Sequence, residues 1–243
     1  MAKSGLPDYG MYAALENMGR LVDYAELAAR LGSIVTYNRE GYLTFYDDFE
    51  KTPLKWAPVK LNGDGFVGLS NEYSQRGGQC LKLQTTATQY HWVGVTRYFP
   101  LVSMENLGME IVLKNENTDC SVIVYFNQYI NGVDYIVKYE LNFKTKTLSF
   151  HGYGTCTGES SGHFNPQRGE YIGHYYKLVI DNHNHRYLRF LYDRKEYNLK
   201  DCTFETTTTS SNDASFCRIY LTNLGTGEKT VYIDNVILTQ NEP

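Results

Sequence analysis

Residues 122–143 read VIVYFNQYINGVDYIVKYELNF, two aromatic and β-branched runs that meet at Asn131-Gly132. Val, Ile, Tyr and Phe favour strands, and alternate residues of a strand share one face of the sheet. An Asn-Gly pair readily adopts the left-handed backbone of a two-residue hairpin turn. The stretch therefore predicts two antiparallel strands joined by a tight turn.

The same pattern extends in both directions from this hairpin. From Ser33 onward, short aromatic or β-branched runs are bounded by Gly, Asn, Asp or Pro, and no helical periodicity separates them. Strands without intervening helices pair antiparallel, and many of them in one domain favour two packed sheets, a β-sandwich. The predicted strands span residues 34–37, 42–46, 80–85, 92–99, 109–113, 122–130, 135–143, 147–151, 175–181, 187–192, 217–222 and 231–238.

The first part of the chain has a different periodicity. Asp23 stands three residues before Glu26, as in a capping box, and Gly32 follows the last apolar residue, which predicts a short helix over 24–31. An earlier helix is expected around 10–19. We therefore divide the chain into an N-terminal helical extension, residues 1–40, and a β-sandwich domain, residues 41–243.

Two stretches are interpreted as connections. The glycine-rich stretch 152–169 is long for a loop in a compact domain, and such loops are often functional. The Thr/Ser run at 206–212 is interpreted as a solvated link between strands.

Composition excludes several classes of protein. The 243 residues hold 23 Lys and Arg against 27 Asp and Glu, a net charge of −4, so a nucleic-acid binder that relies on bulk positive charge is not expected. No apolar stretch approaches the roughly 20 residues of a membrane span, so membrane insertion is not expected either. Met1 begins a polar segment unlike a secretory signal, and a virion-associated or cytoplasmic location is compatible with the chain as given.

The five cysteines lack metal-like spacing and are expected to be mostly buried or free thiols.

Three motifs in order resemble the jelly-roll carbohydrate-binding modules and related concanavalin A-like sandwiches. They are Asp47-Asp48-Phe49-Glu50 followed by Trp56, then SQRGGQCLKL at residues 74–83, then VYIDNV at residues 231–236. Residues 176–199 are similar to a meander common in such sandwiches. The resemblance covers residues 42–240 and implies an antiparallel jelly roll whose first and last strands pair.

The resemblance also implies a structural calcium. Matching positions place its ligands at Glu50 and Asp234, with backbone carbonyls near Gly78, and such a mixture of oxygens suits Ca²⁺. The alternative is that Glu50 and Asp234 are strand-end carboxylates that hold turns or pair with arginine.

The join between the extension and the sandwich, residues 27–50, looks like that of an uncharacterised group of prokaryotic and phage-associated sandwich proteins. In this interpretation the N-terminal helix serves attachment or homo-oligomerisation. The alternative is a helix that packs on the sandwich edge.

Sugar binding needs flat aromatic faces beside side chains that bind hydroxyl groups. The 22 Tyr, 11 Phe and 2 Trp make such surfaces available. The candidate ligand-binding residues are Tyr90, His91, Trp92 and Arg97, which neighbour Tyr98 and Phe99, then Tyr125, Asn127 and Tyr129, and the loop residues Tyr153, His163 and Arg168.

Each of these rings has a simpler interpretation. Aromatic residues also form cross-strand pairs that stabilise sheets without any ligand, and they suit protein–protein surfaces. We expect Trp56 in the core, and the sequence leaves Trp92 open between core and ligand.

Catalytic patterns are scarce. A sandwich glucanase carries acids in an E-x-D-x-x-E pattern on one strand, and this pattern does not occur. The sequence therefore favours a non-catalytic module that binds a carbohydrate. A structural or assembly protein of a virion or cell-surface appendage, whose partner is another protein chain, is the alternative. A cryptic glycoside hydrolase or lyase is third.

Overall fold

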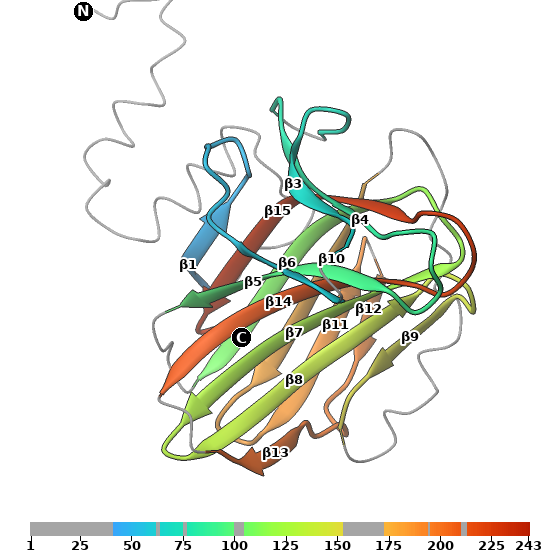
Figure 1. Cartoon of the computed structure of the whole chain (residues 1–243). Helices are drawn as coiled ribbons and strands as arrows, with labels where there is room; N and C mark the ends of the chain where they lie inside the picture. Colours follow the sequence, from blue (N-terminus) through green and yellow to red (C-terminus); the bar gives the residue numbers. More distant parts are fainter. Residues whose placement is uncertain are drawn as a thin grey trace, which may run out of the picture.

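Two antiparallel sheets face one another in the computed structural model (Figure 1). The description covers residues 41–61, 64–74, 77–99, 105–152, 173–193, 195–209 and 213–243. Every element in these ranges is a strand or an irregular connection, and Leu61 is a single residue with helical backbone. The prediction of an antiparallel β-sandwich is confirmed.

The first sheet, which we call sheet A, has eight strands. Its order is β12 (Lys195–Asn198), β11 (Arg186–Tyr192), β10 (His174–Asp181), β6 (Asn106–Asn115), β15 (Thr230–Gln240), β4 (Cys80–Gln84) and β3 (Phe66–Ser70), and β1 (Tyr42–Asp47) pairs with β15.

The second sheet, which we call sheet B, has seven strands. Its order is β13 (Glu205–Thr208), β8 (Val133–Asn142), β7 (Cys120–Ile130), β14 (Ala214–Asn223), β5 (Trp92–Phe99) and β2 (Ala57–Lys60), and β9 (Thr147–Phe150) pairs with β8.

The predicted hairpin is present as β7 and β8. Ile130 pairs with Val133, so the turn consists of Asn131 and Gly132 alone. Both turn residues have positive φ, 51° and 78°, the left-handed conformation that favours Asn and Gly in such turns. Local turn chemistry and the alternation of the two runs agree here, which explains why the sequence located this element correctly.

The first and last strands of the described chain pair with each other. β1 runs antiparallel to β15 from Tyr42 opposite Gln240 to Asp47 opposite Val236. β15 also pairs with β4 and β6, so the strand that carries VYIDNV joins the two ends of the chain to the centre of sheet A. This arrangement confirms the pairing that the resemblance implied.

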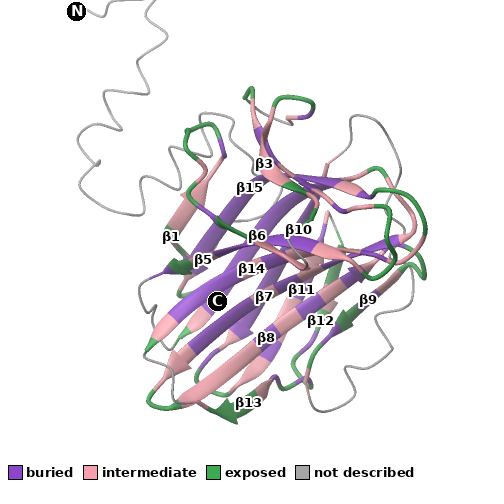
Figure 2. Cartoon of the chain, in the orientation of Figure 1, coloured by how far each residue is buried: buried purple, intermediate pink, exposed green. Residues whose placement is uncertain are grey.

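The space between the sheets is filled by aliphatic and aromatic side chains. Buried residues follow the central strands, whereas exposed residues gather at the turns (Figure 2). Trp56 is 2% exposed and packs against Phe45, Phe49 and Phe99, which confirms its assignment to the core. Phe190 lies at the other side of the core against Tyr139, and its burial follows from the predicted alternation of its strand.

Four strands were not predicted, namely β2, β3, β12 and β13. They occupy the ends of the two sheets, where a strand has a neighbour on one side only. The interpretation of 206–212 as a link is therefore wrong for its first part, because β13 pairs with β8 from Glu205 opposite Ile136 to Thr208 opposite Val133. Backbone pairing rather than side-chain burial holds such an edge strand, so the hydrophobic pattern is weak.

Several sequence predictions lie outside the described residues. They are the helices at 10–19 and 24–31, the strand at 34–37, the extension 1–40 as a unit, and its role in attachment or oligomerisation. Within the described ranges, no helix is long and apolar enough to span a membrane.

Three of the cysteines match the expectation of buried thiols. Cys80, Cys120 and Cys217 are free and buried, and burial raises the pKa of the Cys80 thiol to about 12. Cys202 is disulfide-bonded, which the spacing of the cysteines did not reveal.

A buried ion pair ties the end of β15 to the outside of sheet A. Lys177 Nζ lies 2.7 Å from Glu242 Oε1, and the two side chains are 2% and 0% exposed. Arg189 contacts the same carboxylate at 3.4 Å, and Thr239 donates to it. These contacts fix the residues after β15 against β10 and β11.

We predict that Glu242→Gln lowers the free energy of unfolding by about 3 kcal/mol, because the buried ammonium of Lys177 loses the carboxylate that lies 2.7 Å away. Urea denaturation measures the change. Arg186→Gln, which breaks the more exposed pair with Asp181, serves as the control and should cost less than about 1 kcal/mol. Equal losses in the two variants would contradict the prediction.

Candidate functional site

The outer face of sheet B carries a continuous set of aromatic and polar side chains. In β7, Val122, Val124 and Phe126 point into the core, so Tyr125 and the residues two before and after it point outward. The strands β5, β14, β7 and β8 lie side by side at the front of Figure 1. We call this surface the outer face, and it includes Trp92, Thr96, Tyr98, Ile123, Tyr125, Asn127, Tyr129, Asp134, Ile136, Lys138, Phe216, Arg218 and Tyr220.

Strand register arranges these residues in rows across the sheet. Phe216 of β14 lies opposite Tyr98 of β5 and Asn127 of β7. The next row along places Arg218 between Thr96 and Tyr125.

The rings of the outer face form two groups. Tyr220 contacts Trp92 and Tyr125, with ring centroids 4.8 and 5.7 Å apart. Phe216 contacts Tyr98 and Tyr129 at 5.7 and 5.2 Å. Phe216 and Tyr220 are four residues apart on one strand, which corresponds to about 13–14 Å. The two groups are therefore too far apart for one sugar ring to contact both.

Cations lie between and beside the two ring groups. The guanidinium of Arg218 lies 4.3 Å from the centre of the Phe216 ring, and its Nε donates to Thr96 Oγ1 at 3.1 Å. Lys138 Nζ lies 5.3 Å from the centre of the Tyr125 ring. These contacts hold donors beside aromatic surfaces.

Asp134 and Glu205 lie at one corner of the outer face. Asp134 Oδ1 accepts a hydrogen bond from Asn127 Nδ2 at 3.3 Å. Burial raises the pKa of Asp134, and the charge of Glu205 on β13 acts in the same direction, whereas Asn127 and Arg218 oppose the shift. Glu205 Oε2 lies 2.6 Å from His151 Nε2, just after β9.

The exposure of these groups differs. Tyr98 is 59% exposed, and Trp92, Tyr125, Tyr129 and Arg218 are half-buried. Partly open rings beside fixed donors and acceptors can pack against the apolar side of a sugar and bind its hydroxyl groups.

The structure brings together four of the predicted ligand-binding residues. Trp92, Tyr125, Asn127 and Tyr129 all point outward from sheet B. The question that the sequence left open for Trp92 is answered in part: its ring lies outside the core cluster, against Tyr220.

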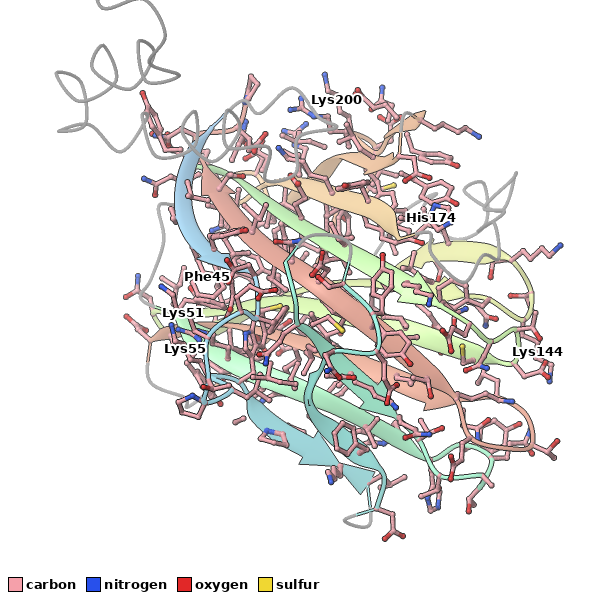
Figure 3. All side chains as sticks on the ribbon, turned by 90° about the horizontal axis from the view of Figure 1, so that it is seen from above. Phe45, Lys51, Lys55, Lys144, His174 and Lys200 are labelled. Carbon is pink, nitrogen blue, oxygen red and sulfur yellow. The ribbon has the colours of Figure 1, made fainter. Side chains whose placement is uncertain are left out.

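Arg97 does not join them. Its guanidinium lies over the Phe45 ring at 4.6 Å and near Asp47, on the opposite side of β5 from Tyr98. Figure 3 shows Phe45, Lys51 and Lys55 on one side of the molecule, with Lys144 on the opposite side. Alternation along the strand separates Arg97 from the outer face, because neighbouring residues point to opposite sides.

Tyr90 and His91 lie in the loop before β5. Tyr90 has a φ of 64° and an exposed ring, and His91 Nδ1 lies 3.1 Å from Thr86 Oγ1. They flank the Trp92 end of the outer face. Tyr153, His163 and Arg168 lie outside the described residues.

The sequence analysis missed several outer-face residues, among them Asp134, Phe216, Arg218 and Tyr220. The alternation of β14 could have identified three of them, because Cys217, Ile219 and Leu221 are core residues. Their relation to β7 could not have been found, because β14 follows β7 only after many intervening residues.

Glu50 has the contacts of a carboxylate that holds a turn. Its Oε1 accepts hydrogen bonds from the backbone N–H groups of Gly78 and Gln79 at 2.8 and 2.9 Å. Donor groups rather than carbonyl oxygens face this atom, so the Gly78 side does not offer the ligands expected for calcium. The hydrogen bonds match the alternative interpretation of Glu50.

Asp234 contacts the same connection between β3 and β4 from the other side. It is fully buried, and Ser74 Oγ donates to its Oδ1 at 3.4 Å. Among the residues described, no group of three or more His, Cys, Asp or Glu is arranged to hold a metal ion. Calcium therefore remains a prediction.

Gly94 gives the Tyr220 ring its place on the outer face. A Cβ atom at this position would overlap the Tyr220 ring and the Ile219 carbonyl oxygen. We predict that Gly94→Ala lowers the free energy of unfolding by about 1–3 kcal/mol, because the ring and backbone must move. Gly78→Ala is the matched control, since its Cβ would find its nearest neighbour at 3.8 Å. Urea denaturation of both variants tests the prediction, and an unchanged Gly94→Ala protein would refute it.

Comparison with known proteins agrees with this architecture. No family model matches the chain, and no curated protein matches it. Among solved structures, the laminarinase catalytic domain of Thermotoga maritima MSB8 aligns over 84% of this chain and 100% of that domain, with a TM-score of 0.50 and 11% identity. The carbohydrate esterase of Shiga toxin-encoding bacteriophage phi24B aligns over 77% and 90%, with a TM-score of 0.49 and 12% identity.

A β-glucanase of Bacillus licheniformis aligns over 81% of this chain and 98% of the other, with a TM-score of 0.43 and 14% identity. At these identities the likeness concerns the fold. The chain has the jelly-roll, concanavalin A-like sandwich that its motifs resemble.

Proposed function

We propose that the protein is a non-catalytic module that binds a glycan on the outer face of sheet B. The observation that supports this most directly is that two groups of aromatic rings, around Phe216 and around Tyr220, lie on neighbouring strands of sheet B with Arg218 between them. Rings on the surface of a sheet are costly to hydrate, and their partial exposure suits a ligand with apolar faces.

The length of the outer face favours an oligosaccharide over a single sugar. One sugar ring can cover one ring group, and only a longer chain can cover both. Each group then contributes to the same binding event, so affinity should rise with chain length.

We predict that Tyr98→Ala and Trp92→Ala each weaken glycan binding by about tenfold or more, because each removes one ring from a different group. Retention on gels that contain neutral polysaccharides, followed by calorimetry with the retained sugar, measures the loss. When both substitutions are combined, the two losses in binding free energy should add for long oligosaccharides only.

Tyr42→Ala is the matched control, because Tyr42 is an exposed aromatic residue on sheet A. It should bind as the unchanged protein does. Two results would overturn the proposal and favour a protein partner. Either the unchanged protein is retained on none of the gels, or the three variants are retained equally.

A structural calcium near Glu50 and Asp234 is a separate proposal. Both carboxylates flank the connection between β3 and β4, so a bound cation would stabilise the native state only. If calcium binds there, the melting temperature rises with added calcium, falls with chelator, and loses this dependence in Asp234→Asn. Identical melting with calcium and with chelator would contradict calcium and leave Glu50 as a residue that holds a turn.

A further inference from the structure

One corner of the outer face holds a buried polar atom that no described residue satisfies with a hydrogen bond. The Asn127 side chain is 6% exposed, and its Nδ2 donates to Asp134 Oδ1. Its Oδ1 is buried and has no hydrogen-bond partner among the described residues. A buried carbonyl oxygen without a donor lowers stability. A ligand hydroxyl group would supply the missing donor.

Three strands bring complementary groups to this corner. Asn127 comes from β7, Asp134 from β8 and Arg218 from β14. Asn127 lies opposite Phe216, and Asp134 lies opposite Tyr129. Two acceptors and a guanidinium donor therefore meet beside the ring group of Tyr98, Tyr129 and Phe216.

We infer that Asn127, Asp134 and Arg218 form a subsite that recognises neighbouring hydroxyl groups of one neutral sugar ring. Asn127 Oδ1 and the Asp134 carboxylate accept hydrogen bonds from two hydroxyls, and the Arg218 guanidinium donates to an oxygen of the same ring. The sugar packs on Tyr98 and Tyr129. This inference rests on the proposed glycan-binding function and assigns its specificity to one corner of the outer face.

The preference for a neutral sugar follows from the charge of Asp134. A uronate carboxylate in the subsite would lie beside this carboxylate and near Glu205, and the positive charge of Arg218 would then be shared among three carboxylates. A hydroxyl group, in contrast, donates to an ionised carboxylate in a charge-assisted hydrogen bond.

The subsite should respond to pH through Asp134. The charged and titratable groups that act on it are Glu205, Arg218 and Tyr129, and His151 pairs with Glu205. Burial raises the pKa of Asp134, so acidification neutralises this carboxylate at a higher pH than an ordinary aspartate. Protonation removes the charged acceptor, and ligand affinity therefore falls as the pH is lowered through that range.

The test uses the full chain, the variants Asn127→Val and Asp134→Asn, and calorimetry with neutral oligosaccharides of glucose, mannose and xylose and with oligogalacturonate. We expect both variants to bind the neutral sugar at least about tenfold more weakly. Asp134→Asn should also lose the fall in affinity on acidification. Asn127→Val should melt close to the temperature of the unchanged protein, because removal of the unpaired oxygen offsets the loss of the hydrogen bond from Nδ2 to Asp134.

A purely structural role for Asn127 predicts the opposite, a lower melting temperature with unchanged affinity, and that result would overturn the inference. Preferred binding of oligogalacturonate would do the same. If Tyr98→Ala loses the sugar while both polar variants keep it, the glycan-binding function stands and the subsite is refuted. If no sugar binds to any form of the protein, the proposed function fails and the subsite fails with it.

Discussion

The antiparallel register of β14 between β5 and β7 is the constraint on which the core and the outer face both depend. In this register Cys217, Ile219 and Leu221 point between the sheets, whereas Phe216, Arg218 and Tyr220 point outward. A shift by one residue would exchange the two sets and bury a guanidinium in the core. Burial of the inner set therefore also positions the outer set, and the candidate site needs no separate scaffold.

Two buried polar clusters, one on each sheet, differ in how completely their polar atoms are paired. On sheet A, Lys177 and Glu242 neutralise each other, and Arg189 and Thr239 complete the contacts of the carboxylate. On sheet B, the buried Oδ1 of Asn127 beside Asp134 has no hydrogen-bond partner within the part of the chain that the structure describes. The first arrangement stabilises the fold, whereas the second lowers stability at the place where the rings are open.

The accuracy of the sequence predictions follows the position of each strand in its sheet. Central strands such as β7 and β10 have a neighbouring strand on each side and the other sheet packed against one face. Most of their side chains are therefore buried, and their hydrophobic pattern is strong. Edge strands such as β13, with the sequence ETTT, are held by backbone hydrogen bonds that no side-chain pattern records. The error for Arg97 has a different cause. It was grouped with Trp92 because the two are close in sequence, although alternation along β5 places their side chains on opposite sides of the sheet.

The sequence by itself determined the antiparallel sandwich, the Asn131-Gly132 hairpin, the burial of Trp56 and the outward direction that Tyr125, Asn127 and Tyr129 share. These features depend on alternation and turn chemistry, which act over a few residues. Only the tertiary structure decided that Asp134, Arg218 and Tyr98 join Asn127 at one corner. That meeting depends on the order of strands within sheet B, and backbone pairing between distant segments leaves no trace in local sequence.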